Sequence, residues 1–184
     1  MGGEVVYSVL NPFKVTIHMF LALLILCCLI ILIYITEPRS QTLVTFKRNT
    51  RILLFLTLFF SLIQIFFGSQ IREFLDVLEP DKFIWSNMIE KSYINTHKLM
   101  ASVVFLSNSF LCISLAGAYS SIRNVPKEII WVFLALMCLI ISGIIMITFN
   151  FPGLAQLIHL VSAFILFGAQ FSLFLKINCS LSNQ

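Results

Sequence analysis

Charged side chains are scarce in this sequence. Only 11% of its 184 residues are Asp, Glu, Lys or Arg, whereas 59% are hydrophobic, 19 are Phe, and the mean hydropathy is +1.00. Soluble domains carry roughly 25% charged residues, so this chain has too few polar side chains to solvate a globular surface. The scarcity excludes a soluble domain, argues against a nucleic-acid partner and indicates an integral membrane protein.

The sequence also lacks a disulfide framework and a signal peptide. No outer loop contains a pair of cysteines, and we interpret the five cysteines as small apolar fillers. They are Cys27, Cys28, Cys112, Cys138 and Cys179. The residues before Val15 contain no basic region, and the first apolar run has no small-residue cleavage site, so insertion is expected to depend on the spans themselves.

Five uncharged runs are long enough to cross roughly 30 Å of hydrocarbon. They are Val15–Ile35, Ile52–Gly68, Leu99–Tyr119, Ile129–Phe149 and Leu154–Ile177. Helices are the simplest way to satisfy every backbone polar group within lipid. The sequence therefore predicts an all-α fold, a polytopic transmembrane helical bundle with five spans.

Charge placement predicts the orientation of the spans. The 36–51 loop, the 120–128 loop and Lys176 hold seven of the twelve basic residues but two of the eight acidic ones, whereas the 72–98 loop holds five acidic and four basic residues. Under the positive-inside rule, the N-terminus is outside and the C-terminus is cytoplasmic. The lack of a transit peptide favours a bacterial cytoplasmic membrane over a mitochondrial inner membrane.

The three histidines share one depth. His18, His97 and His159 each lie at the outer end of a span, within roughly 10 Å of the boundary. Each is followed four residues later by an alanine on the same face, which leaves room for a flat group beside the imidazole. We expect His97 and His159 to ligate one heme iron from both sides. The competing interpretation is interhelical hydrogen bonding.

Basic groups at the same level are candidates to bind the heme propionates. Lys98 follows His97, and Arg72 ends the second span; their alternative role is snorkelling or charge pairing. Zinc is disfavoured, because no second Cys or carboxylate lies at ligand spacing from either ligand histidine. Three other polar residues lie within spans, and interhelical hydrogen bonding is the favoured interpretation for each. They are Gln64, Asn108 and Gln170.

An internal repeat divides the chain. Residues 17–22 are similar to residues 158–163, so the first span repeats the fifth and the repeat unit is four helices. The expected parts are the last helix of a preceding unit, a cytoplasmic loop, a four-helix heme-binding bundle and a cytoplasmic tail. Their bounds are 1–36, 37–51, 52–177 and 178–184.

Several motifs point to one family. Residues 64–76 contain a Gly-x-Gln-x-Arg pattern that ends at Arg72, and they are followed by an outer loop, His97-Lys98, Ser142-Gly143 and His159. Together these segments closely resemble the C-terminal half of the heme A synthase family. Residues 11–19 resemble the fourth helix of that family, so the resemblance covers nearly the whole chain.

The resemblance implies a function. Members of that family have two four-helix halves, each with two histidines at a heme site, and they oxidise a porphyrin methyl of heme O to the formyl group of heme A. It implies that His97 and His159 are the iron ligands of the C-terminal half, with heme b as cofactor, and that His18 is a ligand of the N-terminal half. It further implies heme O or heme A as substrate or product, supplied by a heme O-producing enzyme.

Three departures from the family pattern qualify this assignment. Lys98 stands where members usually carry Arg, which keeps the charge without the bidentate fork. The outer-loop cysteine pairs of many members are absent. Residues 93–96, before His97, include no acid, whereas the acidic residue of the family's N-terminal half is associated with oxidation. We therefore assign no catalytic residue, expect the chain to be a fragment without the catalytic half, and leave open whether it is an enzyme.

The expected partners follow from these features. No flavin or nucleotide motif is present, so an external protein must donate electrons. Membrane lipid is a further partner, together with either a second copy of the chain or a missing N-terminal half. Two rival functions stay open: a bis-His membrane cytochrome without a substrate site, and a small transporter or structural subunit whose histidines shuttle protons.

Overall fold

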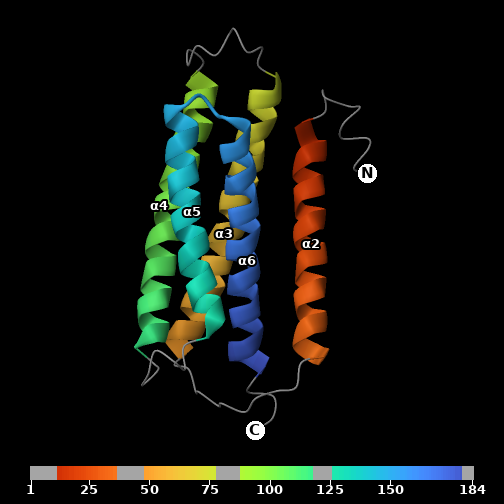
Figure 1. Ribbon diagram of the computed structural model, residues 1–184, viewed down its shortest axis with the longest axis vertical. Helices are drawn as coiled ribbons and strands as arrows, with labels where there is room; N and C mark the ends of the chain where they lie inside the picture. Colours follow the sequence, from red (N-terminus) through yellow and green to blue (C-terminus); the bar gives the residue numbers. More distant parts are fainter. Residues whose placement is uncertain (1–11, 37–47, 78–87, 118–125, 180–184) are drawn as a thin grey trace.

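The structure is a computed structural model that describes residues 12–36, 48–77, 88–117 and 126–179, and within these ranges every regular element is an α-helix (Figure 1). The helices are α2 (Pro12–Thr36), α3 (Arg48–Val77), α4 (Met88–Ala116), α5 (Lys127–Thr148) and α6 (Gly153–Cys179). Each contains a stretch long and apolar enough to cross a membrane. The predicted all-α bundle with five spans is confirmed.

Two helices extend beyond the apolar runs that predict them. Helix α3 continues nine residues past Gly68 to Val77, and α4 begins at Met88, eleven residues before Leu99. These extensions carry charged side chains, which a hydropathy criterion excludes but a helix emerging from the membrane tolerates. Tyr119, the expected end of the third span, lies outside the described residues.

Helices α3 to α6 form an up-and-down four-helix bundle, and α2 lies beside it (Figure 1). Helix α3 packs along α4, α5 packs along α6, and the contacts of α3 with α6 and of α4 with α5 close the bundle. In the described ranges, α4 and α6 share no extensive backbone contact, so these two helices face each other diagonally across the bundle. Any functional group on α4 can therefore meet one on α6 only through the central axis.

From its middle to the end opposite the histidines, the bundle core is mainly apolar, with the buried polar side chains of Thr57, Asn108 and Gln170 among its leucines. Its buried residues belong to all four helices, and several are fully enclosed. Those with no more than 1% exposure are Leu54, Leu111, Leu115, Val132 and Leu173. The outward faces instead carry exposed Leu, Ile, Phe and Val, as a lipid environment requires.

Helix α2 contacts the bundle through α3 and α6. A Cβ at Gly168 would lie 3.4 Å from Leu26 Cδ2 and 3.5 Å from Ile30 Cδ1, so the missing side chain lets α2 approach α6 closely. Near the N-terminal end of α2, Thr16 Oγ1 lies 2.9 Å from Ser69 Oγ of α3. Leu23 packs into a buried cluster with Leu58, Ile65 and Phe167, and the opposite face of α2 is exposed apolar surface suited to lipid.

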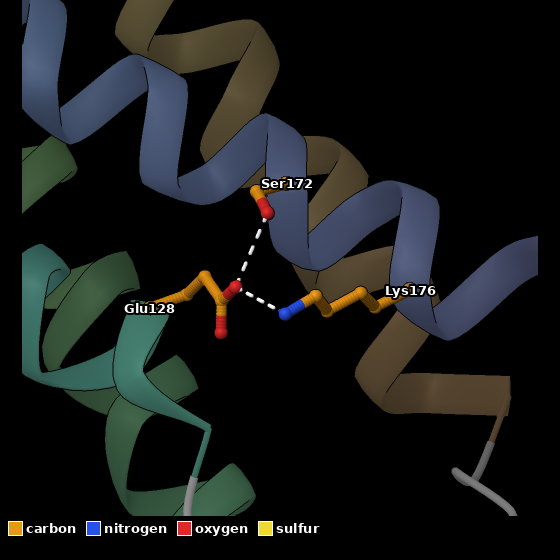
Figure 2. A network of polar contacts seen from close by, with 3 residues as sticks. All are labelled: Glu128, Ser172 and Lys176. Carbon is orange, nitrogen blue, oxygen red and sulfur yellow. Dashed lines mark hydrogen bonds and ion pairs between the residues drawn. The ribbon is translucent and has the colours of Figure 1, made fainter. Parts of the chain in front are cut away.

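A polar clamp joins α5 and α6 at the end of the bundle where α5 begins and α6 ends. Figure 2 shows the Glu128 carboxylate between Ser172 and Lys176, both from α6. Lys176 Nζ donates to Glu128 Oε1 in an ion pair, and Ser172 Oγ donates to the same oxygen at 3.3 Å. The clamp ties the start of α5 to the end of α6, at the end opposite the histidines.

Candidate functional site

The imidazole rings of His97 and His159 meet near the end of the bundle at which α4 and α6 begin. Their centres are 6.4 Å apart, and their planes are tilted by 51°. His97 lies on α4 and His159 on α6, so the rings approach each other across the diagonal. Their shared depth follows from the sequence, because α4 and α6 each carry a histidine five or six residues after the start of their span.

Ser142 on α5 favours one tautomer of His159. The buried Ser142 hydroxyl donates to the Cys138 carbonyl oxygen at 2.6 Å, with the Leu139 carbonyl oxygen at 3.2 Å. Its oxygen also lies 2.9 Å from His159 Nδ1. Since the hydroxyl proton is used on α5, the Ser142 oxygen accepts the proton of His159 Nδ1. This arrangement leaves Nε2 of His159 with a lone pair, the form that binds a metal.

Gln64 on α3 holds His97 in a different way. The Gln64 amide nitrogen donates to the His97 carbonyl oxygen at 3.2 Å and lies 3.1 Å from His97 Nε2. Because the carbonyl oxygen can only accept, this contact fixes which end of the amide faces His97. The amide N–H is therefore directed at the Nε2 lone pair. Within the described structure, His97 Nδ1 and Gln64 Oε1 are buried without a hydrogen-bond partner.

Each ring lies against a glycine of the adjacent helix. A Cβ at Gly68 would be 3.4 Å from His97 Cε1, and a Cβ at Gly143 would be 3.6 Å from His159 Cε1. An added methyl group would just touch the ring, and a larger side chain would displace it. Glycine within a helix costs about 1 kcal/mol relative to alanine, and at these two positions it lets α3 and α5 come close to the imidazoles.

Arg72 and Gln156 form the rim of the site beside the turn between α5 and α6. Arg72 lies one turn beyond Gly68 on α3, and its Nη1 donates to Gln156 Oε1. The Gln156 amide nitrogen in turn donates to the Phe151 carbonyl oxygen at 2.6 Å. Phe151 has a φ of 56° and Asn150 a φ of 53°, a left-handed pair that costs roughly 1–2 kcal/mol per residue. The rim contacts hold this strained turn between α5 and α6 in place.

The two histidines suit a metal whose remaining ligands come from a cofactor. No group of three or more His, Cys, Asp or Glu side chains is gathered in the described ranges, so a zinc-type protein site is not formed there. Two imidazoles sharing one ion hold their centres roughly 6 Å apart, given metal–nitrogen bonds of about 2 Å and about 1 Å from nitrogen to ring centre. The observed 6.4 Å fits one iron held between the two imidazoles.

Comparison with known proteins places the chain in a family. A model of the COX15-CtaA family, described as cytochrome oxidase assembly protein, matches residues 1–171. The chain belongs to this family. The resemblance drawn from its motifs is therefore confirmed, and this COX15-CtaA member is an integral membrane protein with five apolar spans. No curated protein and no solved structure matches it significantly.

The structure of this COX15-CtaA member brings some of the expected site residues together and leaves others apart. His97 and His159 meet, and Arg72 lies at the rim beside Gln156. Lys98 is exposed on α4. His18 is exposed on α2, and no ring contact in the described structure joins it to the other two histidines. The site is thus built from α3 to α6 alone.

Three residues that form the site could not be assigned to it from the sequence. Ser142, Gly68 and Gly143 belong to the motifs that resemble the family, but their sequence positions assign them no contact with the histidines. In the structure Ser142 bonds to His159 and the two glycines face the imidazoles. An isolated glycine within an apolar span is a signal of close packing, and it could have identified both positions. Gln64 was expected to make an interhelical hydrogen bond, and it does so to His97.

Proposed function

We propose that this protein binds heme between His97 and His159 and takes part in the oxidation of heme O to heme A for assembly of the terminal oxidase. The observation that carries the proposal is the ring pair itself. Two imidazoles on diagonal helices lie 6.4 Å apart at one depth, each against a glycine. Membership in a family of cytochrome oxidase assembly proteins supports the same conclusion.

The residues around the pair have distinct roles in this proposal. His97 and His159 hold the iron of heme b, and Ser142 keeps the His159 lone pair on Nε2. Gln64 releases His97 Nε2 when the ring becomes a ligand. Arg72 and Lys98 bind the propionates at the outer surface. When bound, heme supplies an iron centre for redox chemistry, while the protein provides ligation, orientation and a water-poor environment.

The oxidation step is proposed to need other components. The electron donor is an external protein, and heme O comes from the enzyme that produces it. His18, exposed on α2, is proposed as a ligand of a second heme site completed by further helices of another polypeptide or by a second copy of the chain. We further propose that the histidine end of the bundle faces outward in a bacterial cytoplasmic membrane, with the C-terminus in the cytoplasm.

A second candidate function is electron transfer by a bis-His cytochrome. It is favoured by the same ring pair, because two histidines on one iron leave no open coordination position for a substrate. In this case the heme O oxidation site belongs to another polypeptide. The two functions share their ligands and differ in whether added heme O is converted.

Heme titration tests the proposal. The purified protein is titrated with ferric heme b, reduced-minus-oxidised spectra are recorded, and extracted hemes are analysed after incubation with heme O and a reductant. The intact protein and the His18→Ala control are expected to give a low-spin spectrum that His97→Ala and His159→Ala both lose. Heme A in the extract favours synthase activity over electron transfer, and a protein that binds no heme contradicts both functions.

A further inference from the structure

A pair of amides crosses the bundle below the histidines. Asn108 on α4 and Gln170 on α6 both have 0% exposure, and Gln170 Nε2 donates to Asn108 Oδ1 at 2.6 Å. Asn108 Nδ2 donates to the Val104 carbonyl oxygen of its own helix at 2.8 Å. The interhelical bond expected for these residues from the sequence is therefore present, and it joins the two diagonal helices.

The spacing of this amide pair repeats the spacing of the histidines. Asn108 follows His97 by eleven residues, and Gln170 follows His159 by eleven residues. Eleven residues make about three helical turns, so each amide lies on the stripe of its histidine and roughly 16 Å deeper. Helices α4 and α6 thus meet side chain to side chain at two levels with equal separation along both helices.

The amide pair does not satisfy all of its own polar atoms. Gln170 Oε1 is buried without a hydrogen-bond partner in the described structure. Apolar residues such as Leu111 and Leu166 fill the same core, so an apolar pair of similar volume would pack there without an unsatisfied oxygen. Stability alone therefore does not account for amides at these positions. A buried polar pair of this kind can instead select one alignment of two helices, because any slip separates its partners.

We propose that the Asn108–Gln170 pair fixes the register of α4 against α6 and thereby sets the distance and tilt of the His97 and His159 rings. Asn108 and Gln170 are positioning residues, since they act on the imidazoles through the helices. The register claim depends only on the fold, whereas its consequence for a bound heme rests on the proposed function. One experiment on the heme-free protein and one on the loaded protein keep the two claims separate.

The variants isolate the amide pair from general core packing. Asn108→Leu with Gln170→Leu removes the hydrogen bond while keeping the core apolar. Asn108→Gln with Gln170→Asn exchanges the two amides and preserves the bond. The matched control is Thr57→Val, because Thr57 is also 0% exposed but its hydroxyl donates at 2.8 Å to the Leu54 carbonyl oxygen of its own helix. If the double leucine variant does not fold, Gln170→Met replaces it.

The heme-free experiment measures helix register by pulsed electron paramagnetic resonance. Spin labels are placed on Ile113→Cys and Leu154→Cys, in protein whose native cysteines are replaced by serine or alanine. Both positions are exposed, and they lie toward opposite ends of α4 and α6, so the vector between the labels runs mostly along the helix axes and its length follows the register. A register slip of one residue moves a label by 1.5 Å along the helix. The apolar variant is expected to shift the mean distance by about that amount or to broaden its distribution about twofold. The exchange variant and the Thr57→Val control are expected to match the parent protein.

The loaded experiment uses ferric heme b in the same variants. The apolar variant is expected to lose a large part of the low-spin signal or to broaden it, with no loss of thermal stability, and the exchange variant is expected to restore the signal. Unchanged distance distributions in the apolar variant overturn the register claim whatever the heme result. Changed distances in a protein that binds no heme support the register claim and contradict the proposed function.

Discussion

Replacement of Ser142 by alanine tests how the site prepares His159 to bind a metal. In the intact protein the Ser142 oxygen lies 2.9 Å from His159 Nδ1, while its proton is directed at the Cys138 carbonyl oxygen at 2.6 Å. Ser142→Ala removes the acceptor for the Nδ1 proton in a buried position. When a metal occupies Nε2, the ring cannot move this proton to the other nitrogen. The penalty therefore applies mainly to the loaded state.

The magnitude follows from the cost of a buried donor without a partner. Such a group costs about 1–3 kcal/mol, which corresponds to roughly a fivefold to 150-fold loss in heme affinity at about 1.4 kcal/mol per factor of ten. The range overlaps the ~10–100-fold effect of removing the hydrogen-bond partner of a metal-binding histidine. Ser142→Thr retains a hydroxyl and is expected to keep affinity close to that of the intact protein.

The assay is a titration of the detergent-solubilised protein with ferric heme b, followed by Soret absorbance. Ser107→Ala is the matched control, because the Ser107 hydroxyl donates only to the Val104 carbonyl oxygen of its own helix at 3.1 Å. We expect the control to bind heme as the intact protein does. Ser142→Ala that binds heme within twofold of the control refutes the assignment of the His159 proton to Nδ1.

Three further predictions concern other contacts. Gln64→Leu removes the amide N–H directed at His97 Nε2. Heme affinity, measured by the same titration, should therefore stay equal or rise by up to about fivefold. Weaker heme binding would contradict competition between the Gln64 amide and iron for His97 Nε2. Arg72→Leu should weaken binding of heme b by up to about fivefold, because an exposed ion pair contributes about 0.2–1 kcal/mol. Binding of heme b dimethyl ester should stay unchanged; equal losses for both ligands argue for a purely structural contact with Gln156. Glu128→Gln and Lys176→Met should show a coupling energy of about 0.2–1 kcal/mol in a double-mutant cycle of unfolding, because the Lys176 side chain is 45% exposed. A coupling energy above about 2 kcal/mol would contradict a solvent-screened ion pair.

The main features of the fold could be predicted because each span is a long uncharged run. Helix ends could not be located in the same way. Helices α3 and α4 continue into charged segments up to Val77 and from Met88, since a helix needs apolar side chains only where lipid surrounds it. The interhelical role of Asn108 and Gln170 could be predicted from their position within spans, but their pairing could not, because the sequence does not state which helices lie diagonally.

The histidines show both the reach and the limit of sequence reasoning about the site. Equal depth indicated that His97 and His159 could meet, and their rings do lie together. The same argument applied equally to His18, which α2 carries on its exposed face. Depth along a helix can be counted from the sequence, whereas the direction a residue faces depends on how the helices pack. The contacts of Ser142 and Gln64 with the histidines depend on the same packing, so they could not be predicted from the sequence.

We propose that one heme iron binds between His97 and His159. The most direct test is the electron paramagnetic resonance spectrum of the protein loaded with ferric heme b, recorded for the intact chain and for His97→Ala and His159→Ala. We expect a low-spin bis-imidazole signal in the intact chain and a high-spin signal in each loaded variant. Adding free imidazole to a variant should restore the low-spin signal. A low-spin signal that persists in either variant without added imidazole contradicts the proposal.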